Sequence, residues 1–217
     1  MASALSGRAE MLARVRAALA DRPAAPAVPR AYRRSGSLGR PERVALFCER
    51  VADYRARVVR VETSAIAEAV ADVAGGLRLC VPDGVPAGWV PAAVERVRDD
   101  DLAPSELDAL DGVLTGSTVA IAETGTIVLT SAPDEGRRAI TLVPDLHVVV
   151  VAEDRIVELV PEGLAAVAPL VRDERRPVTL VSGPSATSDI ELDRVEGVHG
   201  PRSLVVIVAA EHVGSGA

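Results

Sequence analysis

The chain has 217 residues, the size of one domain or of one domain with an appended arm. All 24 of its cationic residues are arginine, and with 31 acidic residues its formal net charge is −7. An acidic chain with 2% aromatic residues lacks the basic face and stacking platforms typical of nucleic-acid-binding proteins. The absence of lysine also excludes a Schiff-base lysine and a Walker-type phosphate lysine.

The N-terminal region predicts an arm. Residues 5–20 read as an amphipathic helix, with Met11, Leu12, Val15 and Leu19 on one stripe. Residues 21–41 hold four prolines and are expected to form an extended linker. We therefore expect residues 1–41 to form an arm and residues 42–217 to form an α/β domain. The helix could dock on that domain or on a partner protein.

The rest of the chain alternates helical and strand patterns. Helices are predicted from Pro41, from Thr63 or Ser64, from Ser105 and over 161–172, with strands at 58–61 and 77–81. Apolar β-branched runs follow at 119–122, 126–129, 146–151, 178–181 and 204–208. Such runs are typical of strands covered on both faces, which predicts a mostly parallel sheet flanked by helices. Loops at the carboxyl ends of the strands are then the expected ligand positions.

The first candidate site segment is Glu123-Thr124-Gly125-Thr126, between two apolar runs. One interpretation is a tight hairpin in which Gly125 supplies a positive φ. The other is a functional loop in which Glu123 is catalytic and the three following residues bind a ligand. The sequence leaves the two level.

The second segment is 182–191, directly after a predicted strand. A glycine turn followed by hydroxyl residues at a predicted helix start would present backbone N–H groups to a carboxylate or phosphate. The same residues could instead cap that helix. The candidate ligand-binding residues here are Ser182, Gly183, Ser185, Thr187, Ser188 and Asp189.

Histidine and arginine supply the remaining candidates. His199 lies between glycines and titrates near neutrality, so it is a second candidate catalytic residue, whereas His147 opens an apolar strand and is expected in the core. Arg137 and Arg138 could clamp a small carboxylate or could belong to an exposed helix start of mixed charge. Asp189, Glu191 and His199 are too scattered to predict a metal site.

Two observations bear on cofactors and location. Cys48 and Cys80 stand alone and are expected as buried small hydrophobes, because they cannot by themselves hold a zinc ion or an iron–sulfur cluster. We therefore expect no cofactor bound by this chain. The charged N-terminus and the lack of a long apolar run predict a cytoplasmic protein without a membrane span.

Several spaced motifs resemble the LUD-domain family, and within it the lactate utilization protein C group. The residues that carry the resemblance are 115–116, 120–129, 146–151, 182–185, 188–191 and 197–202, with a looser likeness at 12–19 and 29–33. The resemblance implies a fold similar to the NagB/RpiA/CoA-transferase-like group. It also implies a role in oxidising L-lactate to pyruvate together with partner proteins that carry iron–sulfur clusters.

Other functions stay open at this point. The chain could be a stand-alone transferase or isomerase acting on a phosphorylated or CoA-linked substrate, with Glu123 as base or nucleophile. It could also be a regulatory or scaffolding module that uses its N-terminal helix. The sequence does not decide whether the chain is itself catalytic.

Overall fold

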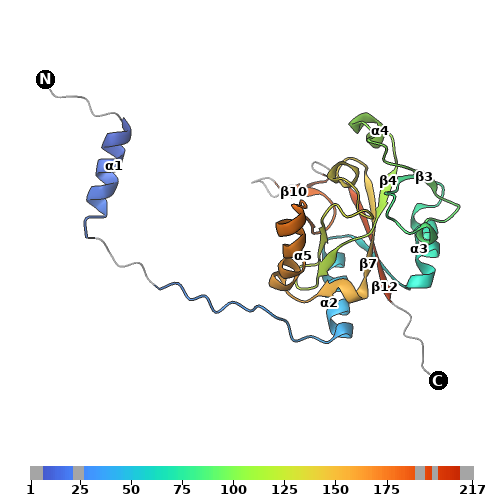
Figure 1. Ribbon diagram of the computed structural model, residues 1–217, viewed down its shortest axis with the longest axis horizontal. Coiled ribbons are helices and arrows are strands. Elements are labelled where there is room, and N and C mark those ends of the chain that lie inside the picture. Colours follow the sequence, from blue (N-terminus) through green and yellow to red (C-terminus); the bar gives the residue numbers. More distant parts are fainter. Residues whose placement is uncertain (1–6, 22–26, 189–193, 197–199, 211–217) are drawn as a thin grey trace. The chain divides into compact units, whose positions relative to one another are not determined.

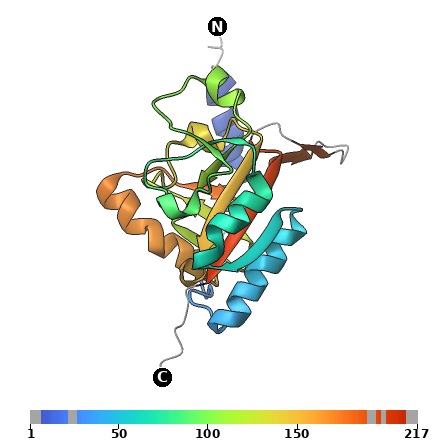
Figure 2. The same ribbon diagram turned by 90° about the vertical axis from the view of Figure 1, so that its right-hand side faces the viewer.

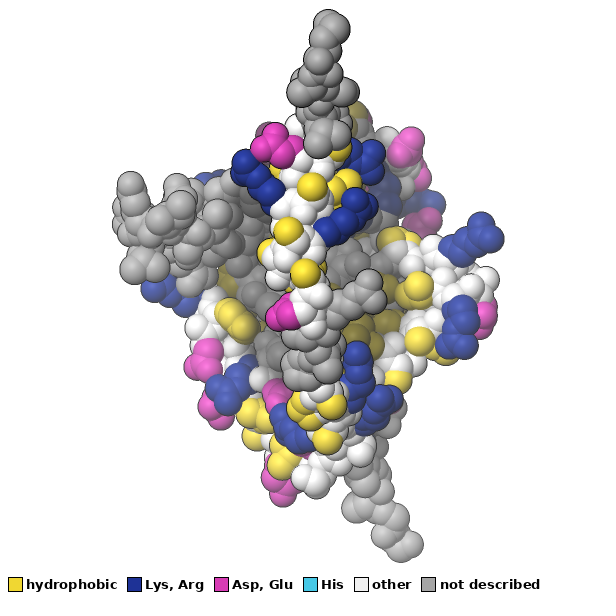
Figure 3. All heavy atoms as spheres, turned by 90° about the vertical axis from the view of Figure 1, so that its left-hand side faces the viewer, with side chains coloured by type: hydrophobic (Ala, Val, Ile, Leu, Met, Phe, Trp, Pro, Cys, Tyr) yellow, Lys and Arg dark blue, Asp and Glu magenta, His cyan; other side chains and the backbone are white. Residues whose placement is uncertain are grey.

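The computed structural model describes residues 7–21, 27–188, 194–196 and 200–210. The chain divides into two compact units, residues 1–32 and residues 33–217. The first unit contains α1 (Gly7–Ala18), which confirms a helix within residues 5–20 but not its amphipathic character, because apolar and charged side chains are not segregated on its faces. None of its residues is buried, and apolar side chains and arginines are both visible on its surface (Figure 3).

The second unit is built on a six-stranded parallel sheet. Its strand order is β1-β12-β7-β4-β2-β3, and every neighbouring pair is parallel. The strands are β1 (Arg57–Glu62), β2 (Arg78–Cys80), β3 (Glu95–Val97), β4 (Gly112–Thr115), β7 (Leu146–Ala152) and β12 (Ser203–Ala210). This confirms the predicted α/β fold with a mostly parallel sheet.

A second, four-stranded sheet has the order β8-β5-β6-β9. Its strands are β8 (Ile156–Val157), β5 (Val119–Ile121), β6 (Thr126–Leu129) and β9 (Thr179–Val181). Because β6 pairs antiparallel with both β5 and β9, the assignment of these three runs to the parallel sheet was wrong. The β5 and β6 runs are buried throughout because both faces of this sheet are covered, and burial on two faces does not by itself specify strand direction.

Alternating side chains place the layers. On β7, Val149 and Val151 pack with α2 (Arg40–Asp53) and the second sheet, whereas Val148 and Val150 pack with α3 (Ile66–Ala74). The outer face of the second sheet packs on Val167 of α5 (Val160–Glu174). Figures 1 and 2 show the resulting order: α3 on one side of the parallel sheet, and α2, the second sheet and α5 on the other.

The sequence explains where several helices begin and end. Pro41 occupies the first turn of α2, where its missing N–H costs no hydrogen bond, and Gly75 ends α3. The side chain of Glu106 in α4 (Pro104–Asp108) accepts from the Ala103 amide at 2.7 Å. Short 3₁₀ turns cover Thr63–Ala65, Ala87–Trp89, Arg138–Thr141 and Glu153–Arg155, and β10 (Ala186–Ser188) pairs antiparallel with β11 (Arg194–Glu196).

The prediction of buried cysteines is confirmed for Cys80, whereas Cys48 is only half-buried. Cys48 packs against the core on the α2 side and Cys80 is buried in a separate cluster, so they are free thiols in different parts of the fold. Among the described residues, no helix has both the length and the apolar character needed to cross a membrane.

Candidate functional site

A pocket of about 240 Å³ lies where the amino ends of β7 and β12 meet the turn after β9. We call it the Arg138 pocket. Its polar lining consists of Arg138, Thr141, His147, Ser182 and Ser185, and its apolar lining includes Leu180, Pro184 and Leu204. Ligand loops were expected at the carboxyl ends of the parallel strands. This pocket lies instead at the amino ends of β7 and β12.

His147 forms part of the inner wall of the pocket. It is 2% exposed, and its Nε2 lies 2.8 Å from Oγ1 of Thr115 on the neighbouring strand β4. Burial, together with the positive charge of Arg138, lowers the pKa of His147 to about 3. The imidazole is therefore neutral at physiological pH. Its burial confirms the prediction of a core histidine, and the structure shows in addition that this residue lines the pocket.

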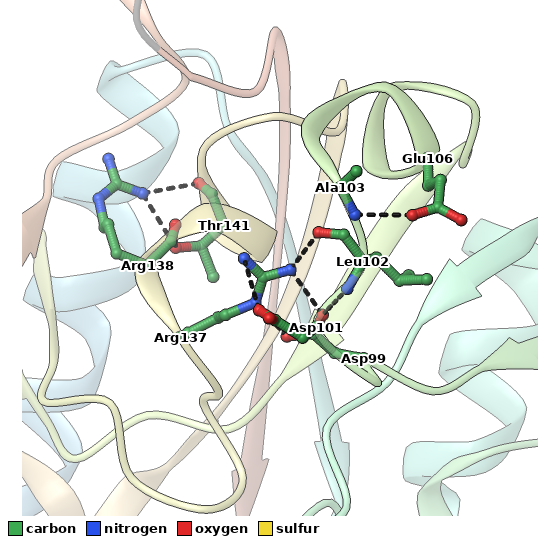
Figure 4. A network of polar contacts seen from close by, with 8 residues as sticks. All are labelled: Asp99, Asp101, Leu102, Ala103, Glu106, Arg137, Arg138 and Thr141. Carbon is green, nitrogen blue, oxygen red and sulfur yellow. Dashed lines mark hydrogen bonds and ion pairs between the residues drawn. The ribbon is translucent and has the colours of Figure 1, made fainter.

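Arg138 brings a positive charge to the pocket. Its Nη1 donates to the carbonyl oxygen and to Oγ1 of Thr141, both at 2.9 Å (Figure 4). Partial burial lowers the pKa of the guanidinium from its ordinary value, although the residue as a whole stays exposed. No carboxylate among the described residues lies within 4.0 Å of it. The guanidinium is thus held by uncharged acceptors and keeps its charge available for an anion.

Arg137, the other predicted clamp residue, makes a separate set of contacts (Figure 4). Its Nε and Nη2 donate to the two carboxylate oxygens of Asp99 at 2.7 and 2.8 Å, and Nη2 also donates to the Leu102 carbonyl at 2.6 Å. The Arg137 hydrogen bond holds the pKa of Asp99 below its usual value. Arg137 therefore ties two loops of its own chain together and does not line the pocket.

The segment after β9 does not begin a helix, which corrects the prediction. Gly183 makes a turn with φ of 84°, the Ser185 amide donates to the Pro201 carbonyl at 2.8 Å, and β10 follows in extended conformation. The glycine-hydroxyl pattern is compatible with either continuation, and here the hydrogen bonds run to another segment instead of to a helical turn. Ser182, Gly183 and Ser185 still line the pocket.

The pocket lies within a part of the chain that matches a known family. A family model, the LUD domain, matches residues 94–209, which include every residue named above as lining the pocket. The chain is 48% identical over 209 residues to lactate utilization protein C of Deinococcus radiodurans, covering 95% of this chain and 97% of that protein. The chain belongs to the LUD-domain family.

Other relatives agree with this assignment. Lactate utilization protein C of Bacillus licheniformis is 36% identical over 101 residues, covering 45% of this chain and 42% of that protein. The crystal structure of a DUF162 family protein from Deinococcus radiodurans superposes with a TM-score of 0.71 at 44% identity, covering 80% of this chain and 99% of that one. Sequence and fold therefore place the chain in the same family.

In this LUD domain a line of hydroxyl groups joins two of the predicted segments. Thr124 Oγ1 lies 2.7 Å from Thr126 Oγ1, which lies 2.8 Å from Ser182 Oγ at the pocket. The line exists because β6 and β9 are neighbours in the second sheet. Thr124 and Thr126 therefore support a pocket residue, although neither lines the pocket itself.

Glu123 and Gly125 lie elsewhere on the LUD domain. Gly125 has φ of 58° in the β5–β6 connection, which is the tight hairpin that the sequence favoured equally with a functional loop. Glu123 forms an ion pair with Arg33 and is not among the residues that line the Arg138 pocket. The structure thus confirms the hairpin, while the catalytic role of Glu123 stays a prediction.

Four further candidate residues lie partly or wholly outside the described part of the chain. Thr187 and Ser188 lie in β10, where only the backbone is described. Asp189 and His199 lie outside the described residues, as does Glu191. Sequence reasoning did not include His147 and Thr141 among the site residues. A histidine within an apolar run was a signal, but only the fold shows that one of its faces borders a pocket.

Proposed function

We propose that this LUD-domain chain acts in lactate utilization and binds a small carboxylate, L-lactate or pyruvate, in the Arg138 pocket. The observation that carries the proposal is the 48% identity to a lactate utilization protein C over 95% of this chain and 97% of that protein. Identity over nearly the full length of both chains supports a shared role better than a match to one domain would.

The chemistry of the pocket suits such a ligand. The Arg138 guanidinium can donate two parallel hydrogen bonds to a carboxylate. Ser182 and Ser185 supply hydroxyl groups for the 2-hydroxyl or 2-keto oxygen, and Leu180 and Leu204 supply an apolar wall for the methyl group. The neutral imidazole of His147 adds a hydrogen-bonding group without adding charge. A singly charged small acid matches this lining.

Oxidation of L-lactate to pyruvate releases two electrons and two protons, which need an acceptor. Burial raises the pKa of the Cys80 thiol to about 11 and also raises that of Cys48, so both remain protonated at neutral pH. No group of three metal-binding side chains occurs within the described part of the chain. We therefore assign the electron acceptor to iron–sulfur partner proteins, as the family resemblance implies, and the carboxylate site to this chain.

Calorimetric titration tests the ligand. L-lactate and pyruvate are titrated into the full chain, into Arg138→Gln and into Arg172→Gln, a control that removes an exposed arginine of α5. We expect Arg138→Gln to weaken binding at least tenfold, which corresponds to about 1.4 kcal/mol, and the control to bind as the parent does. Absence of binding by both acids, or equal affinity in Arg138→Gln, would contradict the carboxylate site.

A second experiment tests the partners. The tagged chain is co-expressed with candidate iron–sulfur partner proteins, and the purified material is examined by visible absorption and by lactate-dependent reduction of a dye. We expect a coloured complex that reduces the dye only when all components are present. Dye reduction by the chain alone, or no complex with any such protein, would overturn the proposal. Deleting residues 1–21 in the same assay shows whether α1 contributes to partner binding.

A further inference from the structure

A second pocket, of about 200 Å³, lies at the carboxyl ends of β2, β4 and β7. We call it the Trp89 pocket. Its lining includes Pro86, Trp89, Ser117, Asp134, Val150 and Arg155. The carboxyl ends of parallel strands are where ligands commonly bind to such sheets. The Trp89 pocket shares no lining residue with the Arg138 pocket. The proposed lactate role does not use it.

Asp134 presents a carboxylate to this pocket on a closely fitted loop. The Gly116 amide donates to the Asp134 carbonyl at 2.9 Å, and the Gly84 amide donates to the Pro133 carbonyl at 3.0 Å. A Cβ atom at Gly116 would clash with Oδ2 of Asp134, so the carboxylate approaches the backbone where only glycine leaves room. Within the described residues, no donor is hydrogen-bonded to the Asp134 side chain and no cation is paired with it.

The neighbouring residue, Glu135, fixes this loop from beneath. It is 1% exposed, and its carboxylate accepts from the Thr130 amide at 2.6 Å, the Ala132 amide at 2.9 Å and the Thr118 hydroxyl at 2.7 Å. These bonds satisfy Glu135 completely within the protein. Glu135 thus anchors the loop inside the protein, while the preceding residue, Asp134, lines the pocket.

Arg155 brings the opposite charge to the same pocket. Its Nη1 donates to the Ser117 carbonyl at 2.9 Å, which fixes the side chain, while Ser117 Oγ donates to the Val150 carbonyl at 3.0 Å. No acidic residue in the described ranges forms an ion pair with Arg155, and Asp134 and Arg155 do not pair with each other. Two fixed charges of opposite sign therefore line one pocket and remain separate.

We propose that the Trp89 pocket binds a free α-amino acid. The ammonium group of the ligand pairs with Asp134, its carboxylate pairs with Arg155, and its side chain packs against Trp89 and Pro86. A zwitterionic α-amino acid carries its two opposite charges on groups attached to the same carbon atom, so it can satisfy both protein charges at once. A ligand with a single charge would leave one of them desolvated and unpaired, which is unfavourable.

The protein carries its own reporter for this site, because Trp89 is the single tryptophan of the chain. The nineteen amino acids other than tryptophan are titrated into the full-length protein while tryptophan emission is recorded, tryptophan itself is titrated by calorimetry, and calorimetry confirms any response. L-lactate and propylamine serve as ligands with only one of the two charges. We expect at least one L-amino acid to bind saturably with a change in emission, and both single-charge analogues to change that emission only at concentrations at least tenfold higher.

Variants then assign the binding to the two charges. Asp134→Asn and Arg155→Gln should each weaken the amino acid at least tenfold, whereas Asp173→Asn, which removes an exposed acid on α5, should not. Circular dichroism establishes that each variant is folded, and Arg155→Gln provides an independent test if Asp134→Asn does not fold. The proposal is overturned if no amino acid binds, if propylamine or lactate binds as tightly in this pocket, or if the folded variants keep parental affinity.

This test is separable from that of the lactate role. Arg138→Gln is expected to lose lactate binding while keeping the amino-acid response of Trp89, and Asp134→Asn is expected to show the reverse. Each pocket can therefore fail without the other.

Discussion

Thr115 Oγ1 and His147 Nε2 lie 2.8 Å apart on adjacent strands of the parallel sheet, and both residues are almost fully buried. The hydroxyl satisfies one nitrogen of an imidazole whose ring borders the Arg138 pocket. Because Arg138 also lines this pocket, protonation of His147 would place two positive charges together in a poorly solvated region. The strand pair thus keeps the histidine neutral beside a cation.

This arrangement predicts a specific dependence of stability on pH. The pKa of His147 is about 3 in the folded chain against an ordinary 6.5, so below pH 6.5 the unfolded chain binds a proton that the folded chain does not. The contribution is fully present above pH 6.5 and is lost as the pH falls towards 3, with a slope of up to about 1.4 kcal/mol per pH unit.

Urea unfolding of the parent and of His147→Gln between pH 4 and pH 7.5 checks this. Other titrating groups are common to both proteins, so they cancel in the difference between the two free energies of unfolding. We expect that difference to move in favour of His147→Gln as the pH falls. Parallel curves would show that His147 takes up its proton equally in the folded and unfolded chains and would contradict the neutral imidazole.

How far the sequence predicts this fold depends on what each pattern contains. The runs that form β7 and β12 are long and mostly apolar, so both strands are predicted from the sequence. The strand β4 was missed because Gly112–Thr115 is short and contains glycine and threonine, and only its position between β2 and β7 makes it a strand. Strand direction in β5, β6 and β9 likewise depends on pairing, which no local pattern specifies.

The sites show the same limit. Ser182, Ser185 and Arg138 were predicted from local chemistry, and the fold brings them together in one pocket. Nothing in the adjacent letters Arg137-Arg138 indicates that the first pairs with Asp99 and the second lines a cavity, because that depends on where residues 99–102 return in space. Asp134 was not singled out for the same reason, since its lack of a partner among the described residues is visible only in three dimensions.

Glu135 supports the loop that carries Asp134, so replacing it should destabilise the chain. In Glu135→Gln the amide nitrogen takes the place of one acceptor oxygen: towards the Thr130 and Ala132 amides it leaves these donors without an acceptor, and towards the Thr118 hydroxyl it replaces a charge-assisted hydrogen bond by a neutral one. Leaving a buried donor without a partner costs about 1–3 kcal/mol. Chemical denaturation should show this loss, whereas Glu49→Gln, at an exposed position of α2, should change stability by less than about 0.5 kcal/mol. An unchanged midpoint in Glu135→Gln would mean that the loop does not depend on this anchor.

Glu162 fastens the segment that leads into α2. Its carboxylate accepts from the amides of Gly36, Leu159 and Glu158 at 2.8–2.9 Å, and these bonds, that to Gly36 foremost, hold its pKa below the ordinary 4.5. The contribution is therefore present above pH 4.5 and is lost as the pH falls through the lower folded value. Glu162→Gln should cost about 1–2 kcal/mol at pH 7 and flatten the stability curve below pH 4.5.

Hydrogen exchange locates this effect. The Gly36 amide should lose protection in Glu162→Gln at pH 7, and in the parent protein on acidification. Glu106→Gln is a matched control, because Glu106 also accepts from a backbone amide, that of Ala103, but makes only that one contact among the described residues. A larger loss of stability in Glu106→Gln than in Glu162→Gln would argue against this role for Glu162.

Gly125 is predicted to be irreplaceable in the β5–β6 hairpin for two separable reasons. Its φ of 58° disfavours any residue with a Cβ atom, by about 1–2 kcal/mol. A Cβ atom at this position would also lie 2.8 Å from the backbone carbon of Arg50 and 2.9 Å from the amide nitrogen of Val51 in α2.

Gly76 also has a positive φ, 83°, but a Cβ atom there would meet no neighbouring atom within 4 Å. Gly76→Ala therefore measures backbone strain alone, and Gly125→Ala measures strain plus the clash with α2. We expect Gly125→Ala to be less stable than Gly76→Ala by at least about 1 kcal/mol in urea unfolding, because helix backbone cannot move away as a flexible side chain can. Equal losses in the two variants would show that α2 yields at this contact and that the hairpin is not fitted against it.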